Sequence, residues 1–176
     1  MNRIVYFLLI VLLMSCSSSE PRRPINPRPS TTVFEQTVDQ AKKIRALEEQ
    51  NIEAFIQADS TNTYISSEQG FWYYYNKKIE ADSNMPQVGD TIQFSYNIMS
   101  LRDSIIYDEN TLGTQTYVVD KQDFLTGVQR GVKLMKVGET MTFIFPSSVA
   151  FGTAGDGDQI GVYQTIKSKI TLLNIK

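Results

Sequence analysis

Histidine is absent from the 176 residues of this sequence, and cysteine occurs only once, at Cys16. Without histidine the chain lacks the usual general base, the commonest metal ligand and every catalytic triad built on imidazole. A single cysteine cannot form a disulfide within the chain, so no covalent bridge supports the fold. We therefore expect no metal site and no cofactor, and chemistry that needs neither.

The net charge is low as well. The sequence has 17 basic and 19 acidic residues, which gives a formal charge of −2 at pH 7. Such a weakly acidic chain has no overall bias towards nucleic acid, so we expect no nucleic-acid partner. The length and the 41% hydrophobic content fit one folded domain with additional segments.

Residues 1–15 resemble a bacterial lipoprotein signal peptide. The apolar run from Ile4 to Met14, about 11 residues long, suits a signal sequence and is too short to span a bilayer. Leu13 and Ser15 ahead of Cys16 resemble a lipobox, in which the cysteine is acylated. An ordinary signal peptide and a buried apolar segment are the alternatives. Lipidation predicts a cell-envelope protein anchored in a membrane, with the outer membrane facing the periplasm as the expected location.

Residues 16–32 follow as a proline-rich tether. They contain four of the six prolines of the sequence. Proline favours extended chain, so at ~3.1 Å per residue the tether can hold a domain up to about 50 Å from the lipid.

The segment at 33–60 contains neither glycine nor proline, and its apolar residues recur at helical spacing. This pattern predicts an amphipathic helix, with a break near Gln50 and Asn51. Its apolar stripe consists of Phe34, Val38, Ala41, Ile44, Leu47, Ile52, Phe55 and Ile56. The sequence does not decide what packs against this stripe. The alternatives are the domain that follows, a second copy of the chain in a homodimer, or another partner.

Beyond residue 68 the pattern changes from helical to extended. Alternating or β-favouring segments predict strands. They lie at 71–75, 92–98, 117–119, 140–145 and 166–173. One short helix is expected at 124–135, where apolar residues recur three or four apart. Antiparallel strands around one short helix define an α+β domain over residues 68–176.

Four blocks in this domain carry a family resemblance. They read VGDTIQFSY, YDEN, FLTGVQRGVKLMKVGE and AFG, in that order. In order and spacing they resemble the FKBP-type peptidyl-prolyl isomerase domain. The resemblance implies an antiparallel sheet wrapped around one short helix, an enzyme of the prolyl isomerase class, and proline-containing polypeptides as substrates.

The resemblance also implies a set of site residues. Tyr96 and Asp108 would form a small polar edge of the catalytic pocket, and Phe151 takes the place of the family's pocket tyrosine. The amide of Leu125 would receive a carbonyl group of the ligand. The residues expected to bind substrate are Tyr107, Tyr117, Phe124, Leu125, Val128 and Ile160.

Four positions depart from the family pattern. Phe151 lacks the hydroxyl group that bonds a substrate carbonyl, and Val128 replaces the tryptophan of the pocket floor. Gln115 and Ser168 stand where phenylalanines are usual. These changes predict a wider and wetter pocket, and they leave open whether it is active.

Prolyl isomerisation suits a chain without histidine. Rotation about an X-Pro bond breaks no covalent bond, and its barrier of about 18 to 20 kcal/mol comes from amide resonance. A pocket that desolvates the imide and binds its twisted form better than its planar forms lowers this barrier. The glycine-rich loop at 150–161 lacks the spacing of a phosphate or calcium loop, and by resemblance it lines the proline pocket.

Nearly the whole chain, including the lipobox, the tether and the segment ahead of the domain, resembles the gliding-motility-associated FKBP-type lipoproteins of Bacteroidota, often called GldI. This closer resemblance implies a folding factor for exported cell-envelope proteins, with gliding or secretion components among its clients. The alternative is a non-catalytic FKBP-fold lipoprotein that acts as a binding or chaperone module.

Overall fold

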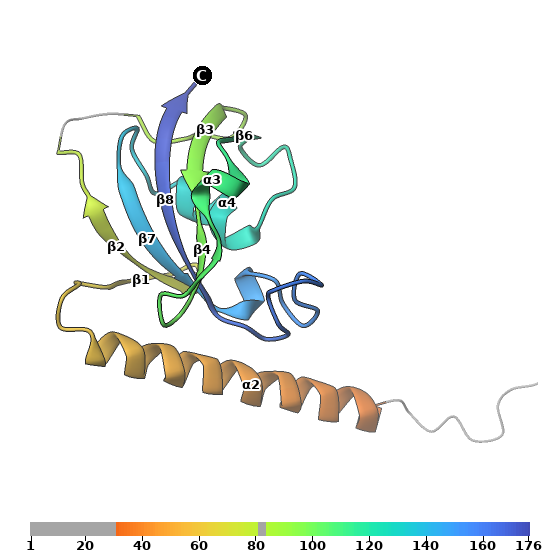
Figure 1. Ribbon diagram of the computed structural model, residues 1–176. Coiled ribbons are helices and arrows are strands. Elements are labelled where there is room, and N and C mark those ends of the chain that lie inside the picture. Colours follow the sequence, from red (N-terminus) through yellow and green to blue (C-terminus); the bar gives the residue numbers. More distant parts are fainter. Residues whose placement is uncertain (1–30, 81–83) are drawn as a thin grey trace, which may run out of the picture. The chain divides into compact units, whose positions relative to one another are not determined.

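The computed structural model describes residues 31–80 and 84–176, and contacts divide the chain into two units, Met1–Gln36 and Thr37–Lys176. All the described strands belong to the second unit (Figure 1). The predicted signal peptide, the predicted lipidation site Cys16 and the predicted tether up to residue 30 lie outside the described residues.

The first described element, α2, is one continuous helix over Thr31–Ala58. This confirms the predicted N-terminal helix at 33–60, although the observed helix begins and ends two residues before the predicted bounds. The break expected near Gln50 and Asn51 is wrong, because the helix runs through both residues. Neither is a glycine or proline, so nothing in the backbone chemistry interrupts the hydrogen bonds between successive turns.

The inward face of α2 differs from the predicted apolar stripe. Glu48 and Ile52 are buried and Phe55 is half-buried, whereas Leu47 is 58% exposed. The stripe prediction is wrong at Leu47 because a glutamate occupies the neighbouring inward position. A polar residue on a buried face is invisible to a hydropathy pattern, which shifts the expected stripe towards the nearest leucine.

One antiparallel sheet of eight strands forms the body of the second unit. Its strands are β1 (Ile65–Ser67), β2 (Phe71–Lys77), β3 (Thr91–Tyr96), β4 (Ile98–Ser100), β5 (Ile105–Tyr107), β6 (Gln115–Val118), β7 (Thr140–Phe145) and β8 (Ile166–Ile175). The order along the main path is β1-β2-β7-β8-β3-β6, while β4 pairs with both β5 and β8. β8 therefore lies in the middle of the sheet (Figure 1).

Five of these strands, β2, β3, β6, β7 and β8, correspond to the predicted ones. The others have three residues each, too few for a periodic signal. Two helical segments, α3 (Glu109–Leu112) and the 3₁₀ turn η1 (Ser147–Val149), were not predicted either. The expected short helix is α4 (Thr126–Val132), which is shorter than the predicted 124–135.

Helix α4 lies directly on β7 because two of its residues are glycines. A Cβ atom at Gly127 would come within 2.5 Å of the Phe145 ring, and one at Gly131 within 3.0 Å of Phe143. The two rings are themselves stacked, with centroids 5.4 Å apart, and both are fully buried. The sheet thus wraps around one short helix, which confirms the predicted α+β architecture.

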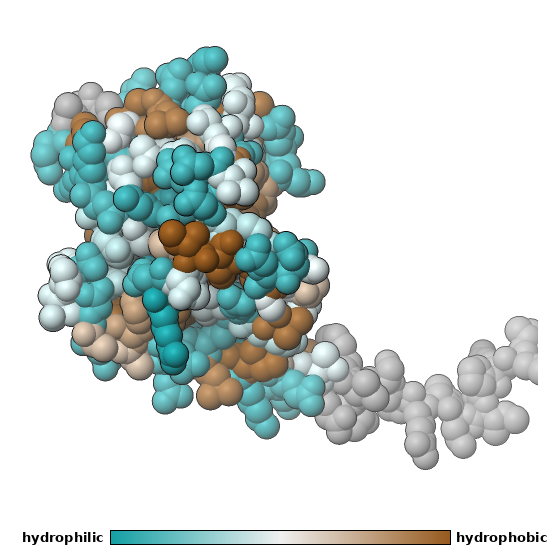
Figure 2. Space-filling model, in the orientation of Figure 1, coloured by the Kyte–Doolittle hydropathy of each residue, from teal (hydrophilic) through white to brown (hydrophobic). Residues whose placement is uncertain are grey.

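The surface carries both hydrophilic and hydrophobic side chains. In Figure 2 hydrophilic side chains cover much of the visible face, and hydrophobic ones appear in several groups among them. The large apolar side chains that are most exposed come from separate elements and loops: Leu47, Ile65, Met85, Val88, Ile105, Val162, Tyr163 and Leu173.

Candidate active site

Four aromatic rings gather where β3 and β6 meet the segment that leads into α4. The ring of Phe124 lies edge-on to Tyr96 at a centroid distance of 5.8 Å, and edge-on to Phe94 at 5.5 Å. Tyr117 contributes the fourth ring, 5.9 Å from Phe124. Phe124 is therefore the centre of an aromatic wall, a packing that stabilises such rings beyond their burial.

The other apolar residues predicted to bind substrate share one core with this wall. Val128 and Ile160 are buried, with 1% and 3% of their surface exposed. Tyr107, Leu125 and Phe151 are partly buried and pack against the same cluster. The structure thus brings together all the apolar and aromatic site residues predicted from the sequence.

The hydroxyl group of Tyr96 is a polar group in this apolar setting. Only 9% of Tyr96 is exposed, and the hydroxyl has no hydrogen-bond partner among the described residues. Burial raises the pKa of the phenol above its ordinary value, so the group stays protonated and remains a donor. A buried donor without a partner is rare in folded proteins and is suited to bind a ligand carbonyl.

A second donor lies next to the aromatic wall. Leu125 is the N-cap residue of α4, with φ −56° and ψ 121°, and no side chain caps this helix end. Its carbonyl oxygen accepts from the Gln129 N–H at 2.9 Å, while its own N–H has no partner among the described residues. The N–H of Leu125 is thus free to receive a carbonyl oxygen, as the family resemblance implies.

Asp108 has a different neighbour from the one expected. Its Oδ1 accepts a hydrogen bond of 2.7 Å from the N–H of Asn110, which makes Asp108 the N-cap of α3. Within the described residues no hydrogen bond joins Asp108 to Tyr96. The carboxylate therefore has a clear local role in capping the start of α3, and the polar edge predicted for Tyr96 and Asp108 is not formed by a direct bond.

Tyr107, just ahead of Asp108, is bonded to the glycine-rich loop instead. Its hydroxyl donates to Asp156 at 2.5 Å, and Asp156 also accepts from the backbone N–H groups of Asp158 (2.9 Å) and Ile160 (2.8 Å). The phenol keeps the pKa of Asp156 below its ordinary value. In return, the hydrogen bond to Asp156 raises the pKa of Tyr107 to about 12.

Sequence reasoning missed Asp156, which connects Tyr107 and Ile160, two residues predicted to bind substrate. The signal available was an aspartate between two glycines, a composition typical of turns in which the side chain bonds nearby backbone. Gly155 has φ +69°, and a Cβ atom there would overlap the carbonyl oxygen of Ile160. Only glycine fits at this close approach of the loop to itself.

Two of the departures from the family pattern have their polar groups satisfied. The hydroxyl of Ser168, a fully buried residue, donates to the carbonyl of Asn97 at 2.7 Å. The amide of Gln115 donates to the carbonyl of Leu112 at 2.6 Å. The Ser168 hydroxyl and the Gln115 amide nitrogen are thus both paired with backbone carbonyl groups.

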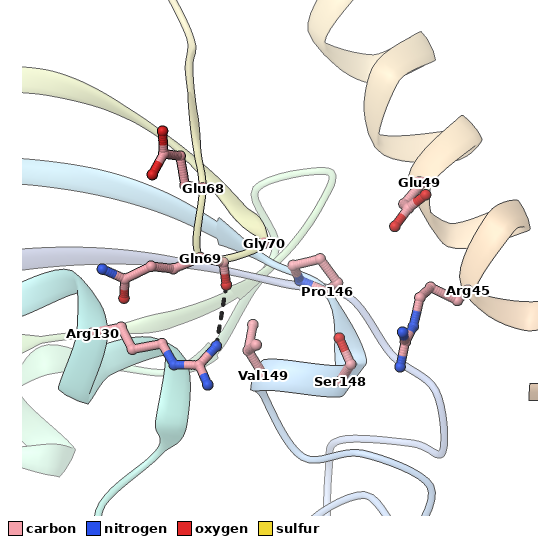
Figure 3. Close-up of a pocket in the computed structure, with 9 residues that line it drawn as sticks. All are labelled: Arg45, Glu49, Glu68, Gln69, Gly70, Arg130, Pro146, Ser148 and Val149. Carbon is pink, nitrogen blue, oxygen red and sulfur yellow. Dashed lines mark hydrogen bonds between the residues drawn. The ribbon is translucent and has the colours of Figure 1, made fainter. Parts of the chain in front are cut away.

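A separate cavity of about 440 Å³ lies beside α2 (Figure 3). Its lining is polar, with two arginines and two glutamates, and Arg130 donates to the carbonyl of Gln69 at 3.1 Å. Figure 3 labels all its residues: Arg45, Glu49, Glu68, Gln69, Gly70, Arg130, Pro146, Ser148 and Val149. None of the predicted site residues is among them, so the region of the aromatic wall is the better candidate for the chemistry.

No helix in residues 31–80 or 84–176 is long and apolar enough to cross a membrane. Over the same part of the chain, no three histidine, cysteine, aspartate or glutamate side chains lie together as metal ligands would.

Residues 82–173 match the family described as FKBP-type peptidyl-prolyl cis-trans isomerase. The chain is also 25% identical over 124 residues to the "Probable FKBP-type peptidyl-prolyl cis-trans isomerase FkpA" of Neisseria meningitidis serogroup B. This match covers 70% of the chain and 44% of that relative, so the chain spans less than half of the relative's length.

Solved structures of similar fold include FkpA from Escherichia coli, with a TM-score of 0.60 and 21% identity. That match covers 99% of this chain and 81% of the other. A peptidyl-prolyl cis-trans isomerase from Pseudomonas syringae pv. tomato gives a TM-score of 0.57 at 17% identity, covering 86% of this chain and 98% of the other. These likenesses confirm the FKBP-like fold.

Proposed function

This chain belongs to the FKBP-type peptidyl-prolyl cis-trans isomerase family, and from that premise we propose that it is a membrane-anchored prolyl isomerase assisting the folding of exported cell-envelope proteins. Proline-containing polypeptides are its substrates. Gliding or secretion components are among its proposed clients, on the closer sequence resemblance alone.

The unpaired hydroxyl of Tyr96 is the observation that best supports catalysis. It is a buried donor in an aromatic wall, and the N–H of Leu125, the residue after Phe124 of that wall, has no partner among the described residues. A purely structural core seldom leaves such donors without partners, because each costs free energy of about 1–3 kcal/mol. Two donors beside an apolar pocket suit a peptide whose carbonyl groups flank a proline ring.

The mechanism needs binding and desolvation only. The proline ring enters the aromatic pocket near Phe124, and the N–H of Leu125 holds a carbonyl group of the peptide. Withdrawal of water from the imide carbonyl weakens the charge-separated planar form, and the twisted form is bound better than either isomer. A tenfold acceleration needs only about 1.4 kcal/mol of such preference.

The loop that carries Phe151 and Ile160 forms the opposite wall in this proposal. In this loop the Asp156 carboxylate accepts hydrogen bonds from the Tyr107 hydroxyl and from the Ile160 N–H, and the bond from Tyr107 holds the loop to β5. Phe151 provides an apolar face without a hydroxyl group. We therefore propose that this protein is a weaker catalyst than one with tyrosine at position 151. The difference is the loss of one hydrogen bond to substrate, which contributes about 0.5 to 1.5 kcal/mol.

The membrane anchor is proposed from the sequence pattern alone. Cys16 follows an apolar run and a lipobox-like triplet, and residues 16–32 are rich in proline. Acyl chains on Cys16 would hold the domain at a membrane, with the outer membrane facing the periplasm as the proposed location.

A non-catalytic binding module is the second candidate function. It is favoured by the missing hydroxyl of Phe151 and by the local bond of Asp108 to Asn110, both of which remove polar groups from the pocket. A homodimer formed through α2 would suit either function.

Catalysis is tested by the rate of cis/trans relaxation of Xaa-Pro peptides, with a soluble form that begins at Ser17. We expect acceleration that a ligand of FKBP pockets abolishes. A folded sample that binds the ligand but gives the uncatalysed rate contradicts the enzyme and supports the binding module. Tyr96→Phe, which removes only the hydroxyl group, should lower the rate if that donor binds substrate.

A further inference from the structure

A buried carboxylate connects α2 to the loops around the proposed pocket. Glu48 is 9% exposed, although the residues on either side of it, Leu47 and Glu49, are exposed. Its Oε2 accepts from the hydroxyl of Ser147 at 2.6 Å, and its Oε1 accepts from the Ser147 N–H at 3.0 Å and from the hydroxyl of Thr165 at 3.1 Å. Three donors thus satisfy one inward carboxylate.

Ser147 anchors the turn that carries Phe151. Its carbonyl oxygen accepts from the N–H groups of Ala150 (3.0 Å) and Gly152 (2.8 Å). Phe151 therefore lies between two residues that are both tied to Ser147. A shift of Ser147 would move this wall of the pocket with it.

Thr165 closes the other end of the same loop. It directly precedes β8, and the loop between η1 and β8 contains Ile160, which is 3% exposed in the core cluster. The two ends of the loop also meet directly, since the Tyr163 N–H donates to the carbonyl of Gly152 at 2.9 Å. Glu48 therefore holds both ends of the segment that carries Phe151 and Ile160.

Apolar packing cannot replace this contact, because a cavity of about 360 Å³ lies beside it. Its lining includes Ile44 and Glu48 of α2 together with Ser147, Gly152 and Tyr163. With open space between the helix and the loop, the hydrogen bonds of Glu48 fix their separation at this point. Packing alone would leave the loop free to shift into the cavity.

A second contact fixes α2 about two turns further along the helix. The ammonium group of Lys167 lies 5.1 Å from the ring centroid of Phe55, and Lys167 is 3% exposed. The same ammonium group pairs with Asp103 at 2.6 Å. Because α2 also contacts Lys167 through Phe55, the part of the helix that carries Glu48 is held in place.

We propose that Glu48 is a positioning residue for the pocket: its hydrogen bonds to Ser147 and Thr165 set the place of Phe151 and Ile160, so α2 is part of the working site. This inference rests on the proposed isomerase function for its kinetic consequence. Its structural consequence, a loop held in place by α2, stands independently of catalysis.

The test compares three variants in the full chain, purified in detergent. Glu48→Ala removes all three bonds and should lower kcat/KM for Xaa-Pro peptides by about tenfold to a hundredfold, as displaced pocket groups do. Glu48→Gln keeps an oxygen for Ser147 N–H and Thr165, and its amide can donate to the Ser147 hydroxyl, so it should stay within about threefold of wild type. Glu53→Ala changes an exposed glutamate of the same helix and should have no effect.

Deuterium uptake by residues 147–165 is measured in the same samples, at a temperature where far-ultraviolet circular dichroism shows full folding. Uptake should rise in Glu48→Ala and stay unchanged in the other two variants. Unchanged uptake with wild-type kcat/KM overturns the proposal, and so does a Gln variant as impaired as Ala. If the wild-type protein is inactive, the proposed function fails, and uptake alone decides whether Glu48 positions the loop.

Should Glu48→Ala not fold, Thr165→Val removes one bond without changing shape, and normal uptake and kcat/KM in that variant contradict the inference.

Discussion

The hydroxyl of Tyr107 donates to the carboxylate of Asp156, which lies 49 residues further along the chain. Tyr107 ends β5, and Asp156 belongs to the loop that carries Ile160. One hydrogen bond thus connects two walls of the proposed pocket. Each partner holds the other in the protonation state that the bond requires.

This bond should make the loop sensitive to pH at both extremes. The pKa of Tyr107 is raised from 10.0 to about 12, so its contribution to stability is complete below pH 10 and is lost as pH rises through about 12. The pKa of Asp156 is lowered from 3.8, so its contribution is present above that value and is lost as pH falls through the folded-state pKa.

Urea unfolding of the wild type and of Tyr107→Phe over this pH range measures the effect. The free energy of unfolding should differ between the two proteins from about pH 4 to pH 10 and converge towards both extremes. A difference that does not vary with pH would mean that the bond to Asp156 is not formed in solution.

Restoring a hydroxyl at position 151 should raise activity. Phe151→Tyr adds the group that can bond a substrate carbonyl, worth about 0.5 to 1.5 kcal/mol, so kcat/KM should rise by about two- to tenfold. Peptide relaxation rates give the comparison. Tyr163→Phe, which removes a hydroxyl from an exposed residue of the same loop, is the matched control and should leave the rate unchanged. No gain from Phe151→Tyr would indicate that position 151 does not face the substrate carbonyl.

Two substitutions of Asp108 distinguish its role as the N-cap of α3 from a catalytic role. Asp108→Asn keeps an oxygen for the N–H of Asn110, so stability should be retained, whereas Asp108→Ala should lose about 0.5 to 2 kcal/mol. If the carboxylate also acts in the pocket, both variants should show lower kcat/KM. An Asn variant with full activity would restrict Asp108 to capping α3. Thermal unfolding and peptide relaxation, measured on the same samples, decide between these outcomes.

The sequence pattern predicted the long strands from alternating apolar and polar residues, as in β3, and from β-favouring residues, as in β2. It could not find β4 and β5, which have three residues each and join through Asp103 in the left-handed region, at φ 66°. It also missed Glu48, because hydropathy treats an inward glutamate as a surface residue. Its burial depends on donors 99 and 117 residues away.

For the site, family resemblance supplied the apolar residues, and the structure gathers them in one core. The polar contacts were harder to predict because they depend on how loops close in space. Asp156 meets Tyr107 only when the glycine-rich loop folds over β5. Asp108 bonds the nearest backbone N–H instead of Tyr96, because a short helix begins directly after it.

Gly127→Ala should destabilise the protein despite the better helix propensity of alanine. The new methyl group would meet the Phe145 ring, which is fully buried and stacked on Phe143 and cannot move away. Overpacking of this kind costs about 1–3 kcal/mol, more than the propensity gain of about 1 kcal/mol. Thr126→Ala, at an exposed position of the same helix, should change stability by less than about 0.5 kcal/mol. Equal urea midpoints for the two variants would contradict this packing.

Cys16→Ala should release the protein from membranes if Cys16 carries the lipid. Each buried methylene contributes about 0.8 kcal/mol to anchoring, and several chains on one residue make it stable. Fractionation of cells that express the variant should find the protein in the soluble fraction, with Ser17→Ala as the membrane-bound control. Continued sedimentation of Cys16→Ala with membranes would refute lipid anchoring at this residue.

The position of β8 determines when this domain can become a folded protein. β8 is the last strand of the sheet in chain order, yet it pairs with β7 on one side and with β3 and β4 on the other. Until Ile166–Ile175 is available, the two halves of the sheet have no strand between them, and each exposes open backbone edges. During synthesis the sheet therefore stays unfinished until its final strand has emerged.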